Sequence, residues 1–483
     1  MAEDNKGKTD KTDKKDIKDT KDAKEKRGVR GIPGAIPAAA TCILICAVLL
    51  TAVSLIPQSA IAKQSKKSAD ILVRQPAFTA LYNDWSNSIQ DNYADTELME
   101  IAYCIDSRRP FTSAVRAEYR EVSGEMTAES YRKLVYEGAE TNKSYGRYWH
   151  GSMVYIRPLL MFLDIDGIRT AVGIAVLILQ AAVLWQLWKA GRKSLAACFL
   201  ISFVLIGPWM LFRCLEYSSV FLVMPAAALC VLHLIRTGRT DRAPAVFAVS
   251  GVVTCFADFL TTETLTYTVP MLILLLFLIE DGKIRETGEA IKTLFVNGAS
   301  WLAGYASMFA VKLLLVLAVC GRAELMNSLH AGAERVGGGV NLGNTNLSPE
   351  ATAGERLSGA IWHNLSALYF TKYADMNRAG AVIPTIVILV AAFAVIYLFR
   401  RELRAAEVIP CCALALLPYL RYLVLSNHAY LHFFFTYRAQ MVCIMALAYL
   451  VWEHGLGNIP ETVGNNGNNG KKTKKRTKKK SKK

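Results

Sequence analysis

Two aspartates that follow the first long apolar run are the clearest candidates for acid-base chemistry. Asp91 and Asp95 lie in the stretch Asp91-Asn92-Tyr93-Ala94-Asp95, so on a helix both carboxylates would share one face. Such a pair can take a proton from a hydroxyl group or hold a divalent cation. We therefore predict Asp91 and Asp95 as catalytic residues. Asp95 could also be the amino cap of a helix over 96–105, and the two roles are compatible.

A basic cluster follows further along the same segment. It reads Arg147-Tyr148-Trp149-His150-Gly151, with Arg157-Pro158 just behind, and it comes shortly before the next apolar run. A lipid phosphate would lie at this depth, and guanidinium groups bind phosphate through two parallel hydrogen bonds. Arg147, His150 and Arg157 are therefore predicted to bind substrate, with anchoring to lipid headgroups as the alternative.

Other ionisable side chains lie at the ends of apolar runs, where they indicate polar sites because charge is costly inside a membrane. Asp258 and Glu263 form one pair, which could bind substrate or cap a pair of helices. His428, His432 and Arg438 lie in an aromatic-rich group, which could also form an interfacial belt. These five residues complete the predicted substrate-binding set. No metal site is predicted, because no nearby carboxylate completes a ligand set around the two histidines.

The composition places these residues in a membrane protein. Of the 483 residues, 53% are apolar, which is unusual for a soluble protein of this length. The formal charge of +16 comes mainly from two low-complexity tails, because residues 471–483 contribute +10 and residues 1–30 contribute +3. We expect both tails to be disordered and to lie near anionic lipid, with no specific binding of nucleic acid.

Ten apolar runs are candidates to cross the membrane as helices. The short basic links between them, such as 189–193, 236–242 and 400–404, all fall on one side if the amino terminus is cytoplasmic. The first run could instead be a signal peptide, but it is longer than a signal core, which favours a retained anchor. A Gly/Asn-rich stretch at 336–346 could be a lid over a site or a flexible connector.

We therefore predict an all-α polytopic transmembrane bundle of about ten helices, with two large extracytoplasmic loops and both termini cytoplasmic. In chain order its parts are a disordered charged tail (1–34), a first span (35–56), a loop domain (57–168), spans two to seven (169–320), a second loop (321–380), spans eight to ten (381–455) and a disordered Lys-rich tail (456–483).

The arrangement resembles the GT-C superfamily of membrane glycosyltransferases, and more closely a group of bacterial polytopic membrane proteins with similar motifs. The likeness covers most of residues 35–455. Besides the two clusters above, it includes Asp258-Phe259-Leu260-Thr261 and His432-Phe433-Phe434-Phe435-Thr436-Tyr437-Arg438. Asp91 lies 35 positions beyond Ile56, which is later than the catalytic acid of that superfamily usually lies.

The resemblance implies an enzyme of the bacterial cell membrane that moves a sugar from a polyprenyl-phosphate carrier to an acceptor in the cell envelope. Asp91 or Asp95 would be the general base or would hold a divalent cation as cofactor. Arg147, Arg157 and Arg438 would bind the lipid phosphate, and His150 and His432 could hydrogen-bond phosphate or sugar.

Two other classes of protein stay open. A transporter for an envelope lipid or polysaccharide would need polar residues at mid-membrane depth and an internal repeat, and neither is clear. A non-enzymatic envelope scaffold or sensor would use its loops to bind partners. The sequence has no nucleotide-binding loop, serine-hydrolase elbow, zinc-protease helix or dinucleotide-binding motif.

Overall fold

The computed structural model describes residues 33–337, 351–399 and 404–455. The predictions for the charged tails, for most of the Gly/Asn-rich stretch at 336–346 and for most of the basic link at 400–404 fall outside the described residues. Within the described residues nearly all regular structure is helical, and the strands form only two short antiparallel pairs. This confirms the prediction of an all-α fold.

In the part of the chain that the structure describes, seven helices are long and apolar enough to cross a membrane. They are Pro33–Ser54, α7 (Ile165–Lys189), α9 (Ser218–Arg236), α12 (Thr287–Cys320), α15 (Arg378–Phe399), α16 (Ala405–Val424), and the segment Phe433–His454, which contains α18 (Phe433–Thr436), η4 (Tyr437–Gln440) and α19 (Met441–His454).

Three further helices coincide with predicted spans but are shorter, namely α8 (Lys193–Leu205), α10 (Ala243–Ala257) and α11 (Leu265–Glu280). Each is about 20–24 Å long, which is less than the roughly 30 Å of a hydrocarbon core. α8 ends early because Gly207 has a φ of 70° and Pro208 begins a 3₁₀ turn, η1 (Pro208–Phe212). The predicted span over 195–212 is therefore a short helix followed by a tight turn.

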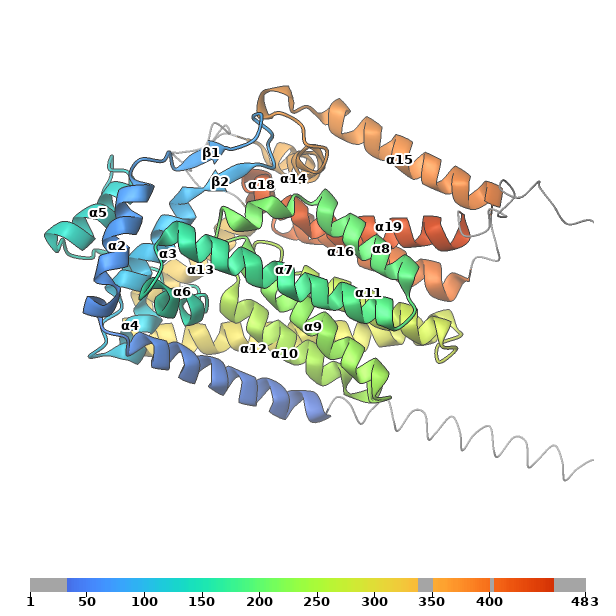
Figure 1. Ribbon diagram of the computed structural model, residues 1–483, viewed down its shortest axis with the longest axis horizontal. Helices are drawn as coiled ribbons and strands as arrows, with labels where there is room; N and C mark the ends of the chain where they lie inside the picture. Colours follow the sequence, from blue (N-terminus) through green and yellow to red (C-terminus); the bar gives the residue numbers. More distant parts are fainter. Residues whose placement is uncertain (1–32, 338–350, 400–403, 456–483) are drawn as a thin grey trace, which may run out of the picture.

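The long helices lie side by side, and the elements of the first loop gather at one end of them (Figure 1). We call residues 58–164 the loop domain. It contains α2 (Gln58–Leu72), β1 (Phe78–Ala80), β2 (Ile89–Asp91), α3 (Asn92–Cys104), α4 (Pro110–Arg116), β3 (Glu118–Tyr119), α5 (Thr127–Glu137), β4 (Lys143–Ser144) and α6 (Met153–Leu160).

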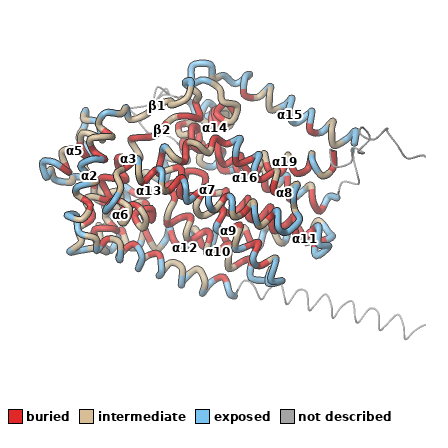
Figure 2. Tube along the Cα trace, in the orientation of Figure 1, coloured by how far each residue is buried: buried red, intermediate tan, exposed pale blue. Residues whose placement is uncertain are grey.

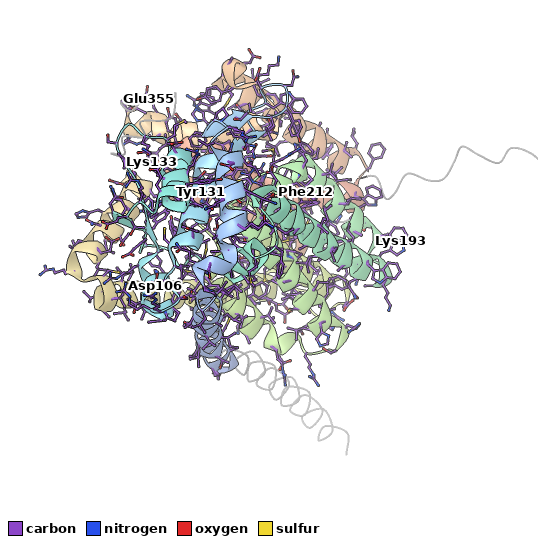
Figure 3. The ribbon with its side chains drawn as sticks, turned by 60° about the vertical axis from the view of Figure 1, so that its left-hand side comes forward. Asp106, Tyr131, Lys133, Lys193, Phe212 and Glu355 are labelled. Atoms are coloured by element: carbon purple, nitrogen blue, oxygen red, sulfur yellow. The ribbon has the colours of Figure 1, made fainter. Side chains whose placement is uncertain are left out.

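The opposite end of the bundle carries basic links and ion pairs. Lys193 projects there, far from Asp106, Tyr131 and Lys133 of the loop domain (Figure 3). Arg192, beside it, pairs with Glu280 and with Asp281. These contacts join the link between α7 and α8 to the end of α11.

The second long loop contributes α13 (Arg322–Gly337), α14 (Ala353–Leu368) and η3 (Tyr373–Asp375). A separate link before the last span contains α17 (Ser426–Leu431). The second long loop contacts the loop domain through the turn between β1 and β2. The Ser86 N–H donates to the Thr371 carbonyl at 2.9 Å, and Trp85 forms an isolated bridge with Lys372. These contacts hold strand β2 and its last residue, Asp91, close to the second long loop.

Buried residues concentrate in the interior of the bundle, whereas the helices at its edge are more exposed (Figure 2). α15 and the first helix, Pro33–Ser54, are mostly exposed, and their exposed residues are largely apolar. α11, in contrast, is buried along almost its entire length. An exposed apolar helix surface of this kind is the surface that a lipid bilayer covers.

Arg157 of α6 ties the loop domain to the first helix. Its side chain is fully buried, and Nε donates to the Val53 carbonyl at 3.1 Å. The two terminal nitrogens donate to the carbonyls of Ala102 and Ile56. The guanidinium group therefore satisfies carbonyls at the end of one helix and near the end of α3.

Glycines allow α10 and α12 to cross at very close distance. A Cβ atom at Gly251 would lie 2.0 Å from the Trp301 carbonyl oxygen, and one at Gly304 would lie 2.0 Å from the Ala248 carbonyl oxygen. The two contacts are reciprocal, as in small-residue packing between membrane helices. Each glycine is needed because backbone atoms of the partner helix occupy the space of a side chain.

We expect Gly304→Ala to destabilise the protein by about 1–3 kcal/mol, because the added methyl group must push the two helix backbones apart. Thermal unfolding in detergent would measure this as a lowered midpoint. Gly288→Ala on the same helix is the matched control, since no atom lies within 4 Å of a Cβ at that position. Equal midpoints for the two variants would show that the close crossing does not limit stability.

Candidate functional site

A cavity of about 310 Å³ lies where the loop domain meets the ends of the bundle helices. We call it the acidic cavity, because four carboxyl groups line it. Its walls come from segments far apart in the chain. Its polar and charged lining residues are Asp91, Tyr93, Glu97, Glu121, Tyr145, Tyr148, His150, Glu216, Arg335, His428 and His432.

Asp91 is the amino cap of α3. Its Oδ1 accepts a hydrogen bond from the Ala94 N–H at 2.8 Å, and its backbone is not helical. The helix begins at Asn92, so Asp91 and not Asp95 is the cap, and the two carboxylates do not share a helix face. Burial, with a smaller contribution from the charges of Asp95 and Glu97, raises the pKa of Asp91 to about 8.

Asp95 points away from the cavity into a set of fixed partners. Its carboxylate accepts from Arg169 Nε at 2.8 Å and from the Leu215 N–H at 2.9 Å, and both charged side chains are almost completely buried. The Glu216 N–H reaches the same carboxylate at 3.3 Å. These contacts use the oxygens that a general base would need, and they favour a structural role for Asp95.

Glu216 faces Asp91 from the bundle side of the cavity. One of its carboxyl oxygens, Oε2, is buried and has no hydrogen-bond partner among the described residues. Burial and the charge of Asp91 raise the pKa of Glu216 well above its ordinary value. Both carboxyl groups are therefore mostly protonated at neutral pH, and Asp91 ionises as the pH rises through about 8.

Glu97 and Tyr93 lie one turn apart on the cavity side of α3. The Tyr93 hydroxyl hydrogen-bonds to the Glu97 carboxylate, while burial raises the pKa of Glu97 to about 7. Arg147 and Arg335 are the cations nearest to it that oppose this shift. The helix thus turns Glu97 toward the cavity and Asp95 toward the bundle.

Three predicted histidines line the cavity. His428 and His432 come from α17 and its carboxyl cap, with ring centroids 4.7 Å apart. Nε2 of His150 donates a hydrogen bond to the Tyr145 carbonyl at 3.0 Å, and His150 has a positive φ of 54°. Burial lowers the pKa of His150 and of His432 to about 3 and that of His428 well below its ordinary value. All three are therefore neutral hydrogen-bonding groups at physiological pH.

Asp258 and Glu263 do not line the cavity. Asp258 accepts hydrogen bonds from the backbone N–H and the hydroxyl of Thr261, which closes the turn after α10. Glu263 forms a buried ion pair with Arg421 at 2.9 Å. Arg421 in turn comes within 3.5 Å of Nδ1 of His428. The ion pair between Glu263 and Arg421 therefore packs behind His428 of the cavity lining.

The three predicted phosphate-binding arginines have different surroundings. The guanidinium group of Arg157 donates to three backbone carbonyls, as described above. Arg438 is also buried, donates to the Phe434 and Asn87 carbonyls, and lies over the rings of Tyr217 and Tyr437. Arg147 is only partly buried, its centre lies 3.9 Å from the Tyr145 ring centroid, and its Nε has no hydrogen-bond partner among the described residues. Nε of Arg438 also lacks a partner among the described residues, but of the three arginines Arg147 is the one that lines a cavity.

The structure thus brings Asp91, His150, His428 and His432 together. Asp95, Arg157, Asp258, Glu263 and Arg438 lie outside the cavity lining, and Arg147 borders two neighbouring cavities. In the described ranges, no group of three or more His, Cys, Asp or Glu side chains is placed to hold a metal ion, so we assign no step to a cation.

The cavity also contains residues that the sequence analysis did not select as site residues. Glu97 lies two turns into α3, and Tyr93 at the i−4 position was a usable signal because the two share a helix face. Glu216 lies in a short link between two apolar helices, where a carboxyl group is unusual. Arg335 reaches the cavity because α13 packs against α17, and no local pattern indicates this.

No protein-family model, curated protein or solved structure matches the chain. Function is therefore inferred from the geometry of the chain itself.

We expect Asp95→Asn to destabilise the protein by about 3–5 kcal/mol, because it removes the buried charge partner of Arg169 and leaves only the exposed Asp166 beside it. Asp91→Asn should keep or raise the wild-type unfolding midpoint, since it replaces a buried carboxyl group whose ionisation is unfavourable. Thermal unfolding in detergent at neutral pH measures both. Equal losses in the two variants would contradict the different roles assigned to these aspartates.

The difference in unfolding midpoint between the wild type and Asp91→Asn should also depend on pH. A carboxyl group whose pKa is raised on folding stabilises the protein fully below its unfolded pKa, and this stability is lost as pH rises through the folded pKa. Between the ordinary pKa of 3.8 and the folded pKa of about 8, the contribution of Asp91 falls. The midpoint of Asp91→Asn should therefore fall less steeply with pH than that of the wild type.

Proposed function

We propose that the chain is an integral membrane glycosyltransferase-like enzyme that takes a sugar from a polyprenyl-phosphate carrier. The supporting observation is the meeting of two cavities at Arg147 and Tyr148. Tyr148 lines both the acidic cavity and a second cavity of about 220 Å³, which we call the apolar slot. Arg147 lines the slot beside it. A base, a cation and an apolar groove are the parts that a lipid-phosphate substrate requires.

The proposed topology has ten crossings, with α8, α10 and α11 as the three short ones. The loop domain lies outside the cell, and both termini lie in the cytoplasm of a bacterium. The basic residues at the opposite end of the bundle support this orientation, because Lys and Arg are enriched in cytoplasmic links. The two large loops then form an extracytoplasmic surface that can reach acceptors in the cell envelope.

The apolar slot suits a lipid chain. Apart from Arg147, its lining is Tyr148, Trp149, Cys255, Leu260, Tyr305 and Phe309. Phe309 is 38% exposed on the side of α12 that faces lipid, and it is about 33 Å along the helix from Thr287. The slot therefore lies near the outer surface of the bilayer, and a chain from the outer leaflet can enter it sideways.

Asp91 is the residue best placed to act as general base. Its pKa is close to physiological pH, where a base is both ionised in part and strong enough to take a proton. In the proposed reaction the carboxylate takes the proton of an acceptor hydroxyl, and the hydroxyl oxygen bonds to the anomeric carbon. The bond from that carbon to the phosphate oxygen breaks, and polyprenyl phosphate leaves with the bonding electron pair.

Arg147 and Arg335 stabilise the negative charge that develops on the leaving phosphate. Arg335 lines the acidic cavity, and its centre lies 5.5 Å from the Tyr148 ring centroid. Its buried Nε has no hydrogen-bond partner among the described residues. The two guanidinium groups therefore approach Tyr148 from the loop domain and from α13, on either side of the place where a phosphate would lie.

We expect Arg147→Ala to weaken binding of polyprenyl phosphate roughly ten- to hundredfold, because one charge-assisted contact is lost. The measurement is a titration of the purified protein in nanodiscs with polyprenyl phosphate. Arg108→Ala is the matched control, since Arg108 is an exposed arginine of the same loop domain. An unchanged dissociation constant in Arg147→Ala would remove the phosphate site from this position.

We expect Asp91→Asn to reduce release of polyprenyl phosphate from a polyprenyl-phosphate hexose by roughly 10²–10⁴-fold while lipid binding persists. Wild-type turnover should rise with pH through about 8, because only the ionised form of Asp91 takes a proton. The assay follows the released lipid phosphate in the presence of an envelope glycan fraction as acceptor. Full turnover by a folded Asp91→Asn protein would reject Asp91 as the base, and no turnover by the folded wild type would leave the scaffold or transporter class as the better description.

A further inference from the structure

A third cavity lies outside the membrane-facing part of the molecule. It measures about 640 Å³ and is formed between the β3–β4 pair of the loop domain and the first turns of α13. We call it the polar chamber, because nearly all of its lining side chains are polar. Its volume is in the range of pockets that hold a small organic ligand. Neither Asp91 nor any other carboxylate of the acidic cavity lines it.

The charges around the polar chamber balance. Glu118 and Glu324 carry negative charge, and Lys143 and Arg147 carry positive charge. Two of these four are also engaged by neighbours, because Glu118 pairs with Arg116 at 3.3 Å and Lys143 pairs with Glu121 at 3.2 Å. A chamber with balanced and partly paired charges favours a neutral polar ligand over an anion or a cation.

The chamber also has unused hydrogen-bonding capacity. The hydroxyl of Ser328 is buried and has no partner among the described residues, and the same holds for Nε of Arg147. Asn327 and Thr141 add an amide and a hydroxyl to the lining. The wall therefore offers both donors and acceptors. A ligand with many hydroxyl groups can pair with both kinds, and leaving such buried groups unpaired is costly.

The polar chamber and the acidic cavity share a wall. Arg147 lines the chamber, and its guanidinium group stacks on Tyr145, which lines the acidic cavity. A chain of sugar units in the chamber would therefore end against the side chains that separate it from Asp91. Joining the two spaces would require the Arg147 and Tyr145 pair to move apart.

We propose that the polar chamber binds a neutral oligosaccharide. Its role as the acceptor site rests on the proposed function, since the acceptor hydroxyl would then reach Asp91 across the Arg147 and Tyr145 wall. The binding itself does not depend on any reaction. It can therefore be tested on the intact protein without a lipid donor.

The test is a calorimetric titration of the purified full chain in nanodiscs with neutral trisaccharides built from hexoses or N-acetylhexosamines. A uronic-acid trisaccharide serves as the anionic comparison. We expect saturable binding of at least one neutral trisaccharide and weaker binding of the anionic one. The proposal would be overturned if the folded wild type bound none of the neutral trisaccharides, or if it bound the anionic trisaccharide more tightly.

Two variants locate the site. Ser328→Ala, which removes only the hydroxyl, and Asn327→Leu should each raise the dissociation constant of the neutral sugar by about tenfold or less, and together by more than tenfold. His330→Leu is the control, since His330 is exposed on the same helix and does not line the chamber. Unchanged affinity in the double variant would place the sugar elsewhere.

The outcomes separate this proposal from the proposed function. Sugar binding that follows the chamber variants, in a protein that never releases polyprenyl phosphate, would keep the chamber and reject the transferase. Turnover that depends on Asp91 but is unaffected by the double chamber variant at limiting acceptor would keep the transferase and reject the chamber as its acceptor site.

Discussion

The buried ion pair between Asp95 and Arg169 is the interaction on which the acidic cavity depends. Two charges without access to water are costly, so they persist only where further hydrogen bonds satisfy them. Here Arg169 also donates to the Asn92 side chain, and the Asp95 carboxylate receives the N–H groups of Leu215 and Glu216. The pair thereby joins α3, α7 and the link before α9. Asp91 and Glu216 are adjacent to these contacts in the chain, so their separation across the cavity is fixed by a group that does not line it.

This arrangement shows how residues of one type take different roles. Asp91, Asp95 and Glu216 are all buried carboxyl groups within one small region. Asp95 has a full set of positive and N–H partners, whereas Asp91 accepts one strong backbone hydrogen bond and Glu216 has an unpaired oxygen. The surroundings, rather than the residue type, therefore decide which group holds a charge and which exchanges a proton.

Local patterns in the sequence were sufficient for the general architecture and for part of the site. Apolar runs indicated the helices, and polar clusters in the first loop indicated Asp91 and Arg147. The pairing of Asp91 with Asp95 on one face was wrong, because the helix starts at Asn92 and turns the second aspartate away. Glu216 and Arg335 could not be ranked from sequence, since they reach the cavity through contacts between segments more than 100 residues apart. The residue type alone also could not distinguish the role of Arg147 from that of Arg157, because both are arginines. The partners of Arg157 are backbone carbonyls.

The carbonyl partners of Arg157 lie at positions 53, 56 and 102, all earlier in the chain than Arg157 itself. The first helix and most of the loop domain can therefore lock together while the ribosome is still making the rest of the chain. The other contacts can form only later in synthesis. Trp149 donates to the Met308 carbonyl, and the cavity lining includes His428 and His432. Synthesis thus proceeds with the carboxyl groups open to water until the last helices insert. A chain cut short before residue 428 would lack two residues of the cavity lining, so the acidic cavity is enclosed only once the last helix has been made.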